Sequence, residues 1–379
     1  MRIGIVGGGQ LAAMLVKANQ KVGAPNQIHV LDHNSNCPAA LAGGIYVPGE
    51  IATGDGYPEL AARSDVLTID LENVAVDKLA ELQSEHLKVI PDLSLLQRIT
   101  DKLEQKKWLQ ELGLPTAPFQ PHDGENPVVE SQFGFPVVQK AARGGYDGRG
   151  VFVLRSAADN DARLRVPGFL EQYIDRKMEV SVMVAANTAG EVVAYEAVEM
   201  VFHEGGNVLD YLVAPARLPA RQLRAAQDLA VRTISAIGGT GIFGIEMFLT
   251  TDDELLINEI SPRTHNSGHY TTEACVTSQF DQQLRILSGQ ELGDARQLIP
   301  AVMFNILGAA GFEGDTVVDI DPSLENDDQI AIHIYGKTHC FPGRKMGHVT
   351  VTAETVEDAL AKMLDIRERI TIRGAKQLV

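Results

Sequence analysis

Two acidic side chains occupy positions from which they could bind one divalent cation. The stretches GIFGIEMFLT and LLINEI flank the acidic segment TDDE, and their apolar, β-prone residues predict a hairpin. If its loop is centred between Asp252 and Asp253, Glu246 and Glu259 face each other, with Cβ atoms about 5 Å apart. Two carboxylates at that spacing repel unless a cation lies between them, and such oxygen ligands suit Mg²⁺. Because apolar residues surround both acids, we favour this interpretation over a solvated pair on an exposed face.

A glycine-rich loop carries the positive charge that a polyphosphate requires. The predicted strand FPVVQK ends in Lys140, and AARGGYDGRG follows before a second predicted strand, VFVL. Glycines there would let backbone amides wrap phosphates, while Lys140 adds a point charge. An ordinary hairpin tip is the alternative, but such a tip has no need of Arg143, Asp147 and Arg149. A basic flap, a lysine and two facing glutamates are the components of a phosphoryl-transfer site.

Further polar residues lie on neighbouring predicted strands and loops. Glu171 is on the predicted strand FLEQYI, where main-chain groups could meet an adenine or ribose edge. Glu179 and His203 lie on or beside the predicted antiparallel pair KMEVSVMVAAN and EVVAYEAVEM, although a lone histidine is more often an exposed residue than a ligand. After Glu259 comes SPRTHNSGH, a polar loop of the kind that commonly contacts substrate.

The charge balance makes the basic clusters informative. The 379 residues carry a formal net charge of −17, which argues against nucleic-acid or membrane binding. No apolar run approaches the roughly 20 residues of a membrane span, and MRIGIVGGG lacks a signal peptide's features, so we expect a cytoplasmic protein. The motif PGRKMGH holds Arg344 and Lys345 between glycines, an arrangement that fits a compact anion site and equally a solvated turn. Three widely spaced cysteines predict reduced thiols.

A strand, a glycine turn and a helix open the chain. RIGIV predicts the first strand, and QIHVLD, IYV, VLTID and KVI predict further strands of a parallel sheet covered by helices. A glycine turn at a helix N-terminus is a phosphate-binding arrangement. Gly7, Gly9, Ala12 and Asp32 also fit the dinucleotide-binding pattern, so an NAD-dependent oxidoreductase is a rival hypothesis.

The rest of the pattern predicts helices and a small terminal module. A helix is expected from Ile99 to Gly113, with Thr100 or Asp101 as its N-cap, and another over 219–237. TTEACVTSQFDQQLRILSG predicts one helix after the polar loop. AVMFNILG, QIAIHIYGK and a short helix near 354–366 predict a small α+β unit. AIHIYGKT is not a P-loop, because it begins with alanine and predicts a strand entering a turn.

The order of the motifs resembles that of a known enzyme family. GGGQL, GGYDGRG, EVSV, IEMF, INEISPRTHNSGHY and PGRKMGH resemble the N5-carboxyaminoimidazole ribonucleotide synthases, which are ATP-grasp enzymes of purine synthesis. The resemblance covers essentially the full chain, and NEISPRTHNSGH with PGRKMGH is its specific part. It implies a mixed α/β and α+β fold: a Rossmann-like pre-ATP-grasp domain in 1–98, an ATP-grasp domain in 99–290 with a mobile flap about 115–185, and a small α+β domain in 291–379.

The resemblance also implies a reaction and a set of site residues. The reaction is carboxylation of 5-aminoimidazole ribonucleotide by ATP and bicarbonate through carboxyphosphate, performed by a homodimeric ligase with Mg²⁺ at Glu246 and Glu259. Asp147, Arg149 and Lys345 would act on the reacting groups. The implied nucleotide contacts are Lys102, Lys140, Gly145, Tyr146, Asp147, Gly148, Arg149, Gly150, Val151, Glu171, Gln172, Tyr173, Ile174, Glu179, His203, Asn258 and Glu259. The implied ribonucleotide contacts are Gly8, Gly9, Gln10, Leu11, Glu72, Asp147, Arg149, His265, Asn266, Arg344 and Lys345.

Three other functions remain as alternatives. One is another ATP-grasp ligase of purine synthesis, such as the formate-dependent glycinamide ribonucleotide formyltransferase. The second is the NAD-dependent oxidoreductase. The third is a catalytically inactive nucleotide-binding or assembly module, which is disfavoured because Lys140 and both candidate metal ligands are present.

Overall fold

A five-stranded parallel sheet forms the N-terminal part of the chain. The structure is a computed structural model that describes residues 1–378 except 24, 129–130, 146–149 and 204–207. The strand order is β3-β2-β1-β4-β5, and every pairing is parallel, as predicted. The strands are β1 (Arg2–Val6), β2 (Gln27–Asp32), β3 (Ile45–Pro48), β4 (Val66–Ile69) and β5 (Lys88–Val89). The helices are α1 (Gln10–Gln20), α2 (Pro38–Leu41), α3 (Tyr57–Ala62), α4 (Val76–Leu82) and α5 (Leu93–Ile99).

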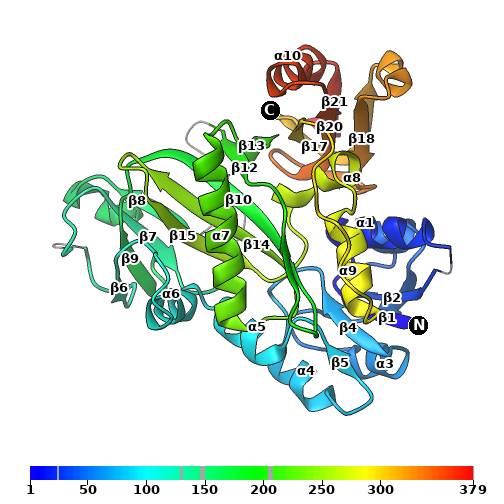
Figure 1. The fold of residues 1–379 in the computed structure, drawn as a ribbon, viewed down its shortest axis with the longest axis horizontal. Helices are drawn as coiled ribbons and strands as arrows, with labels where there is room; N and C mark the ends of the chain where they lie inside the picture. Colours follow the sequence, from blue (N-terminus) through cyan, green and yellow to red (C-terminus); the bar gives the residue numbers. More distant parts are fainter. Residues whose placement is uncertain (24, 129–130, 146–149, 204–207, 379) are drawn as a thin grey trace.

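A small antiparallel sheet follows helix α6 (Lys102–Glu111) and forms the lobe at the left of Figure 1. Its order is β6-β9-β7-β8. The strands are β6 (Phe119–His122), β7 (Val137–Ala141), β8 (Val151–Leu154) and β9 (Gly168–Gln172), with a 3-10 helix at Ala157–Ala162. We call this lobe the flap lobe. It has a small core of its own around Val128, Val137, Leu154 and Leu170, so it can keep its shape while contacting the rest of the chain through few elements.

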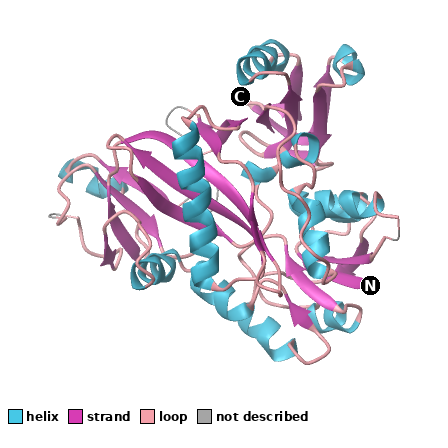
Figure 2. Cartoon of the chain, viewed as in Figure 1, coloured by secondary structure: helices cyan, strands magenta, loops and turns pink. Residues whose placement is uncertain are grey.

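A nine-stranded sheet runs through the middle of the molecule (Figures 1 and 2). Its order is β15-β14-β10-β12-β13-β16-β20-β18, and β11 pairs with β10. The first strands are β10 (Arg176–Ala186), β11 (Val192–Ala194), β12 (Val198–Phe202), β13 (Leu209–Ala214), β14 (Gly241–Thr250) and β15 (Leu255–Ser261). The last are β16 (Ala301–Leu307), β18 (Ile330–Ile334) and β20 (Lys345–Thr352). Strands from both sides of residue 291 therefore share one sheet, joined where β13 pairs with β16.

The C-terminal end adds a three-stranded sheet and a helix. Strands β17 (Phe312–Ile320), β19 (His339–Cys340) and β21 (Ile370–Gln377) pair in the order β19-β17-β21. A 3-10 helix at Pro322–Asn326 and helix α10 (Val356–Arg367) complete it. A core shared by β16, β20 and α10 holds this part to the nine-stranded sheet.

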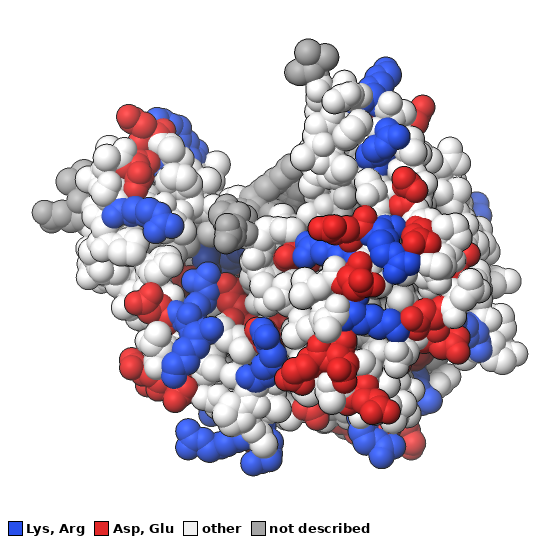
Figure 3. Space-filling model, turned by 90° about the horizontal axis from the view of Figure 1, so that it is seen from above, with Lys and Arg blue, Asp and Glu red and all other residues white. Residues whose placement is uncertain are grey.

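The surface carries charges of both signs. Seen from above, acidic and basic side chains are interspersed, and the molecule is hollowed between the flap lobe and the remainder (Figure 3). Within the described residues, no helix combines the length and the hydropathy needed to cross a bilayer.

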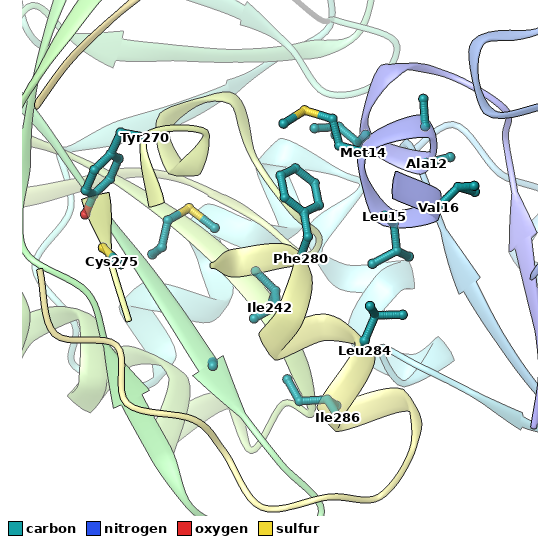
Figure 4. Close-up of a cluster of buried hydrophobic side chains, with 14 of the residues drawn as sticks. Ala12, Met14, Leu15, Val16, Ile242, Tyr270, Cys275, Phe280, Leu284 and Ile286 are labelled. Carbon is teal, nitrogen blue, oxygen red and sulfur yellow. The ribbon is translucent and has the colours of Figure 1, made fainter. Parts of the chain in front are cut away.

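Helices cover both faces of the nine-stranded sheet. Helix α7 (Ala220–Ile237) crosses one face (Figure 2) and buries Ala226, Leu229, Ala230 and Ile234 against it. On the other face, α9 (Gln279–Leu287) packs between the sheet and α1, so that Phe280 and Leu284 lie against the apolar side of α1 (Figure 4). This double contact ties the N-terminal sheet to the strands that carry the candidate site.

Two predicted helices have different ends in the structure. The helix predicted after the polar loop is broken into α8 (Thr271–Ala274) and α9. The break occurs because Ser278 caps α9 in a reciprocal pair with Asp281, and the Cys275 segment bonds to 296–297 instead. The helix predicted from Ile99 begins only at Lys102, because Asp101 caps it by accepting two backbone N–H bonds.

Candidate active site

A deep cleft opens where the flap lobe, the β14–β15 hairpin and the N-terminal sheet meet. Its volume is about 1,940 Å³, enough for a nucleotide and a second substrate. Most of the predicted site residues line it: Gly9, Gln10, Leu11, Glu72, Lys102, Lys140, Gly145, Val151, Glu171, Gln172, Tyr173, Ile174, Glu179, His203, Glu246, Asn258, Glu259, His265, Asn266 and Lys345. The fold therefore brings predicted site residues from all three parts of the chain into one cleft.

The hairpin places Glu246 opposite Glu259, as predicted, but through a bulge that was not predicted. Near the turn the pairs are Leu249–Leu255 and Met247–Ile257, which centre the loop on Asp252. The register shifts by one residue between Glu246 and Met247, and this shift makes Glu246 the partner of Glu259. A bulge also re-aims side chains. Here the consecutive residues Asn258 and Glu259 both line the cleft.

The two facing glutamates differ in protonation. Burial, together with the charge on Glu259, raises the pKa of Glu246 to about 8. Burial also acts on Glu259, but Lys102 and other cations outweigh it and hold the pKa of Glu259 below its usual value. Lys102 Nζ lies 2.7 Å from Glu259 Oε2. Without a cation between them, one acid keeps its proton and the other is paired, as expected for carboxylates that cannot both ionise.

Lys140 enters the cleft from the end of β7. Its Nζ donates to Asn258 Oδ1 at 2.8 Å and lies 2.6 Å from Glu171 Oε2. Glu171 is therefore an ion-pair partner of a lysine, and its side chain is 2% exposed. Strand β9 ends at Gln172, so Tyr173 and Ile174 follow it as irregular chain rather than as the predicted strand. Both residues line the cleft.

The polar loop after β15 supplies a neutral histidine and an amide. Burial, with the charge of Arg263, lowers the pKa of His265 to about 3, so its imidazole is uncharged near neutral pH. His265 Nδ1 lies 2.9 Å from Ser267 Oγ. Both polar side-chain atoms of Asn266 are buried and have no hydrogen-bond partner among the described residues. An unpaired buried amide in a cleft is typical of a group that binds a ligand.

Glu72 joins the N-terminal sheet to this loop. Its carboxylate accepts from the Arg263 guanidinium at 2.9 Å. Charges on Glu72 and Asp70 oppose the effect of burial on Arg263, and the pKa of Arg263 stays above its usual value. Arg263 was not among the predicted site residues, although it lies in the motif SPRTHNSGH.

The glycine turn at the start of α1 is occupied by the chain's own carboxylates. Gly8 N donates to Asp32 Oδ2 at 3.0 Å, and Gly9 N and Ala12 N donate to Asp70 at 2.8 and 2.6 Å. These amides cannot also bind a dinucleotide pyrophosphate. Asp32 likewise faces the turn instead of a ribose, which removes the structural basis of the oxidoreductase hypothesis.

A few predicted site residues lie elsewhere. Gly8 and Gly150 are not among the residues that line the described cleft, and neither is Arg344, whose guanidinium donates to the carbonyl of His339 beside the Phe341 ring. Arg344 lies between the turn at Gly343 and the first residue of β20, Lys345. Tyr146, Asp147, Gly148 and Arg149 lie outside the described residues.

Two lysines near the site carried no prediction. Lys337, in the stretch dismissed as a failed P-loop, donates to Gln10 Oε1 at 2.8 Å and to the Lys345 carbonyl at 2.7 Å. Lys106 is buried on α6 beneath Lys140. Helical spacing could have revealed Lys106, because it lies on the same face as buried Leu109.

Comparison with known proteins gives concordant similarities. Three family models match: a ribonucleotide synthetase preATP-grasp domain over 1–100, an ATP-grasp domain over 107–280, and a phosphoribosylaminoimidazole carboxylase C-terminal domain over 301–362. N5-carboxyaminoimidazole ribonucleotide synthase of Synechococcus elongatus is 37% identical over 357 residues, covering 92% of this chain and 89% of the relative.

Solved structures are similar over nearly the whole chain. N5-carboxyaminoimidazole ribonucleotide synthetase from Thermotoga maritima has a TM-score of 0.88 and 38% identity, covering 98% of this chain and 99% of that one. N5-carboxyaminoimidazole synthase from Aspergillus clavatus, solved with ADP and 5-aminoimidazole ribonucleotide, has a TM-score of 0.86 and 31% identity, covering 97% of both chains.

Proposed function

The chain belongs to the N5-carboxyaminoimidazole ribonucleotide synthase family of ATP-grasp enzymes, and from that membership we propose how its residues perform the family's reaction. It is an ATP-dependent ligase that carboxylates 5-aminoimidazole ribonucleotide to N5-carboxyaminoimidazole ribonucleotide in purine biosynthesis. The observation that carries the proposal is the cleft in which Glu246, Glu259, Lys102 and Lys140 converge beside the polar loop.

We propose a two-step reaction in this cleft. A bicarbonate oxygen attacks the γ-phosphorus of ATP, so that a P–O bond forms and ADP leaves. The amine of 5-aminoimidazole ribonucleotide then attacks the carboxyl carbon of carboxyphosphate. A C–N bond forms, phosphate leaves and the amine loses a proton. Lys102, Lys140 and Lys345 would offset the negative charges that meet here.

The ligands are proposed to bind on opposite sides of the two glutamates. ATP would lie between the flap lobe and the hairpin, along Lys140, Gln172, Tyr173 and Ile174. The ribonucleotide would lie toward the N-terminal sheet, against the Gln10 turn and the polar loop, where the Asn266 amide has no partner in the described part of the chain. Asp147 is proposed to orient the substrate or to accept its proton. Arg149 is proposed to balance the negative charges of the reacting groups. They follow Gly145, which lines the cleft.

The first prediction concerns the identity of the acceptor. Phosphate release from ATP is expected only when bicarbonate and 5-aminoimidazole ribonucleotide are both present, because carboxyphosphate needs the amine to complete the turnover. A coupled phosphate assay across ribonucleotide acceptors measures this. Activity with formate and glycinamide ribonucleotide would instead assign the chain to the formyl-transfer enzymes.

Magnesium is proposed as the cofactor on the basis of the donor set. Glu246 and Glu259 pair across the hairpin, and both line the cleft with Asn258, so carboxylate and amide oxygens are available close together. No group of three or more His, Cys, Asp or Glu side chains in the described part of the chain could hold a metal alone. This fits a Mg²⁺ ion that arrives with a nucleotide, since Mg²⁺ usually binds one or two carboxylates plus phosphates. When bound, it would neutralise charge on the transferred phosphoryl group.

Metal-free protein is expected to lose stability as pH rises, because of Glu246. Its pKa is raised from 4.5 to about 8, chiefly by burial. Such a carboxyl contributes stability that is fully present below the unfolded pKa and is lost as pH rises through the folded value. Glutamine resembles the protonated acid. We therefore expect E246Q, in EDTA near pH 8, to melt at least about 3 °C above wild type.

Near pH 4.5 the melting temperature of E246Q should not exceed that of wild type. Wild-type Glu246 is protonated in the folded state at that pH, so its burial costs little. Adding Mg²⁺ with ADP near pH 8 should remove the difference, because the ion stabilises only the wild-type carboxylate pair. Thermal unfolding followed by circular dichroism measures all three conditions. Equal melting temperatures near pH 8 in EDTA would show that Glu246 is ionised without strain.

Quaternary structure and cellular location are proposed from the family resemblance. We propose a homodimer, for which light scattering should give twice the chain mass of 41.0 kDa. We propose the cytoplasm as its compartment. Three buried, free cysteines are in keeping with a reducing compartment. Fractionation of cells that make the protein tests the location.

A further inference from the structure

We propose that Lys106 is a positioning residue, which keeps Lys140 available to the phosphates of ATP by neutralising half of the Glu171 carboxylate. This inference rests on the proposed function, because it takes Lys140 as a phosphate contact. Lys106 itself lies below the cleft and does not line it. It would therefore act through its neighbours.

One carboxylate is shared by two lysines. Lys106 Nζ lies 2.5 Å from Glu171 Oε1, and both side chains are 2% exposed. Lys140 Nζ lies 2.6 Å from the other oxygen, Oε2. The three groups together carry one net positive charge; Lys140 and Glu171 both line the cleft, and Lys106 does not. If Lys106 were neutral, Lys140 and Glu171 would cancel, and the cleft would lose that charge.

Stability alone does not account for a lysine at this position. Burying an ammonium and a carboxylate costs about as much as their attraction returns, and an apolar pair of similar volume is often equally stable. Burial lowers the pKa of Lys106 to about 8, while the charge on Glu171 opposes that effect. Lys106 is therefore charged near neutral pH, and its charge offsets that of Glu171.

Lys106 also supports the bulge that aims the metal-ligand candidates. Its Nζ donates to Thr116 Oγ1 at 2.6 Å, and Thr116 Oγ1 donates to the Ile257 carbonyl at 2.7 Å. Ile257 precedes Asn258 and Glu259, and its N–H donates to Pro115 O at 2.8 Å. The segment 115–116 and Lys106 thus hold the bulged strand from outside its ladder.

A cavity of about 10 Å³, no larger than one water, lies against Lys106 and several residues of the cleft. It is lined by Lys102, Gln105, Lys106, Lys140, Phe169, Asn258 and Glu259. Lys106 therefore shares this small cavity with Lys102 and Lys140, the two lysines that are proposed to contact the nucleotide.

The first test replaces Lys106 with methionine, which keeps the length and removes the charge. We expect kcat/KM for ATP to fall at least about tenfold, or about 1.4 kcal/mol. The KM for 5-aminoimidazole ribonucleotide should change less than about threefold, because that substrate is proposed to bind on the other side of the glutamates. The matched control is K107M. Lys107 is the next residue of α6 and pairs with Glu104 on the surface, so K107M should keep wild-type kinetics.

The decisive test is rescue. In K106M/E171Q the carboxylate that cancels the charge of Lys140 is gone, so the double variant should recover most of the activity that K106M loses. The K106M change should thus cost at least about tenfold in the wild-type background but less than about threefold in the E171Q background. A double variant as impaired as K106M, or more so, overturns the proposal and makes Lys106 a merely structural residue.

Two further outcomes are separable. If K106M does not fold, E171Q and K106M/E171Q are compared with each other, and a further loss of tenfold or more in the double variant overturns the proposal. If wild type and K107M both lack turnover with 5-aminoimidazole ribonucleotide, the proposed function fails instead. The positioning role is then measured by the affinity for ADP, which K106M should weaken and the added E171Q change should restore.

Discussion

Replacing Glu259 with glutamine is expected to lower kcat about a thousandfold, the upper range for losing one electrostatic group at a reacting centre. Glutamine keeps the shape of the side chain but cannot offer a charged oxygen to Mg²⁺. It also leaves Lys102 without the carboxylate that lies 2.7 Å from its Nζ. Phosphate release at saturating ATP, bicarbonate and 5-aminoimidazole ribonucleotide is the measurement.

The control for this variant is E254Q, an exposed glutamate in the turn of the same hairpin. E254Q should turn over at the wild-type rate. Because Glu246 still pairs across the ladder from position 259, E259Q should also keep its fold, which circular dichroism verifies. A folded E259Q with normal kcat would remove Glu259 from the mechanism.

Replacing Lys140 with methionine is expected to lower kcat/KM for ATP about a hundredfold, equivalent to about 2.7 kcal/mol, within the range for a hydrogen bond to a charged group. Lys140 brings a positive charge to the cleft and orients Asn258 by donating to Oδ1 at 2.8 Å. Both contributions vanish with methionine. Steady-state kinetics with ATP as the varied substrate measures the loss.

This variant should fold, because Glu171 keeps its other partner, Lys106. K107M again provides the control, since it removes one lysine from the outer face of α6. A hundredfold loss confined to kcat, with the affinity for ADP unchanged, would contradict a ground-state contact with the nucleotide. It would place the effect of Lys140 in the transition state alone.

Sequence periodicity and turn chemistry predicted the positions of most strands and the facing pair of glutamates. They could not predict the bulge before Asn258, because it is held by Pro115, Thr116 and Lys106, which come from distant segments. The predicted pairing of Glu246 with Glu259 was nonetheless confirmed. The loop is centred half a residue away from the expected position, and the one-residue shift at the bulge brings the two glutamates opposite each other.

Long-range contacts also decide where other predicted residues lie. Arg344 and Lys345 are adjacent basic residues that the local sequence does not distinguish. In the structure Lys345 lines the cleft, whereas Arg344 donates to the His339 carbonyl. A glycine turn that fits a phosphate-binding pattern is filled by Asp70, which lies 61 residues away from Gly9. Local pattern specifies which groups are present, but long-range partners decide which of them remain available to a ligand.

The pairing of β13 with β16 limits how the chain can be shortened. A truncation before residue 301 would remove β16 and leave the backbone N–H and C=O groups of β13 as an open edge, flanked by the buried side chains of Leu212 and Val213. Open edges of this kind promote self-association of the truncated chains. A minimal version of this enzyme would therefore need either the C-terminal strands or a designed substitute that closes the edge.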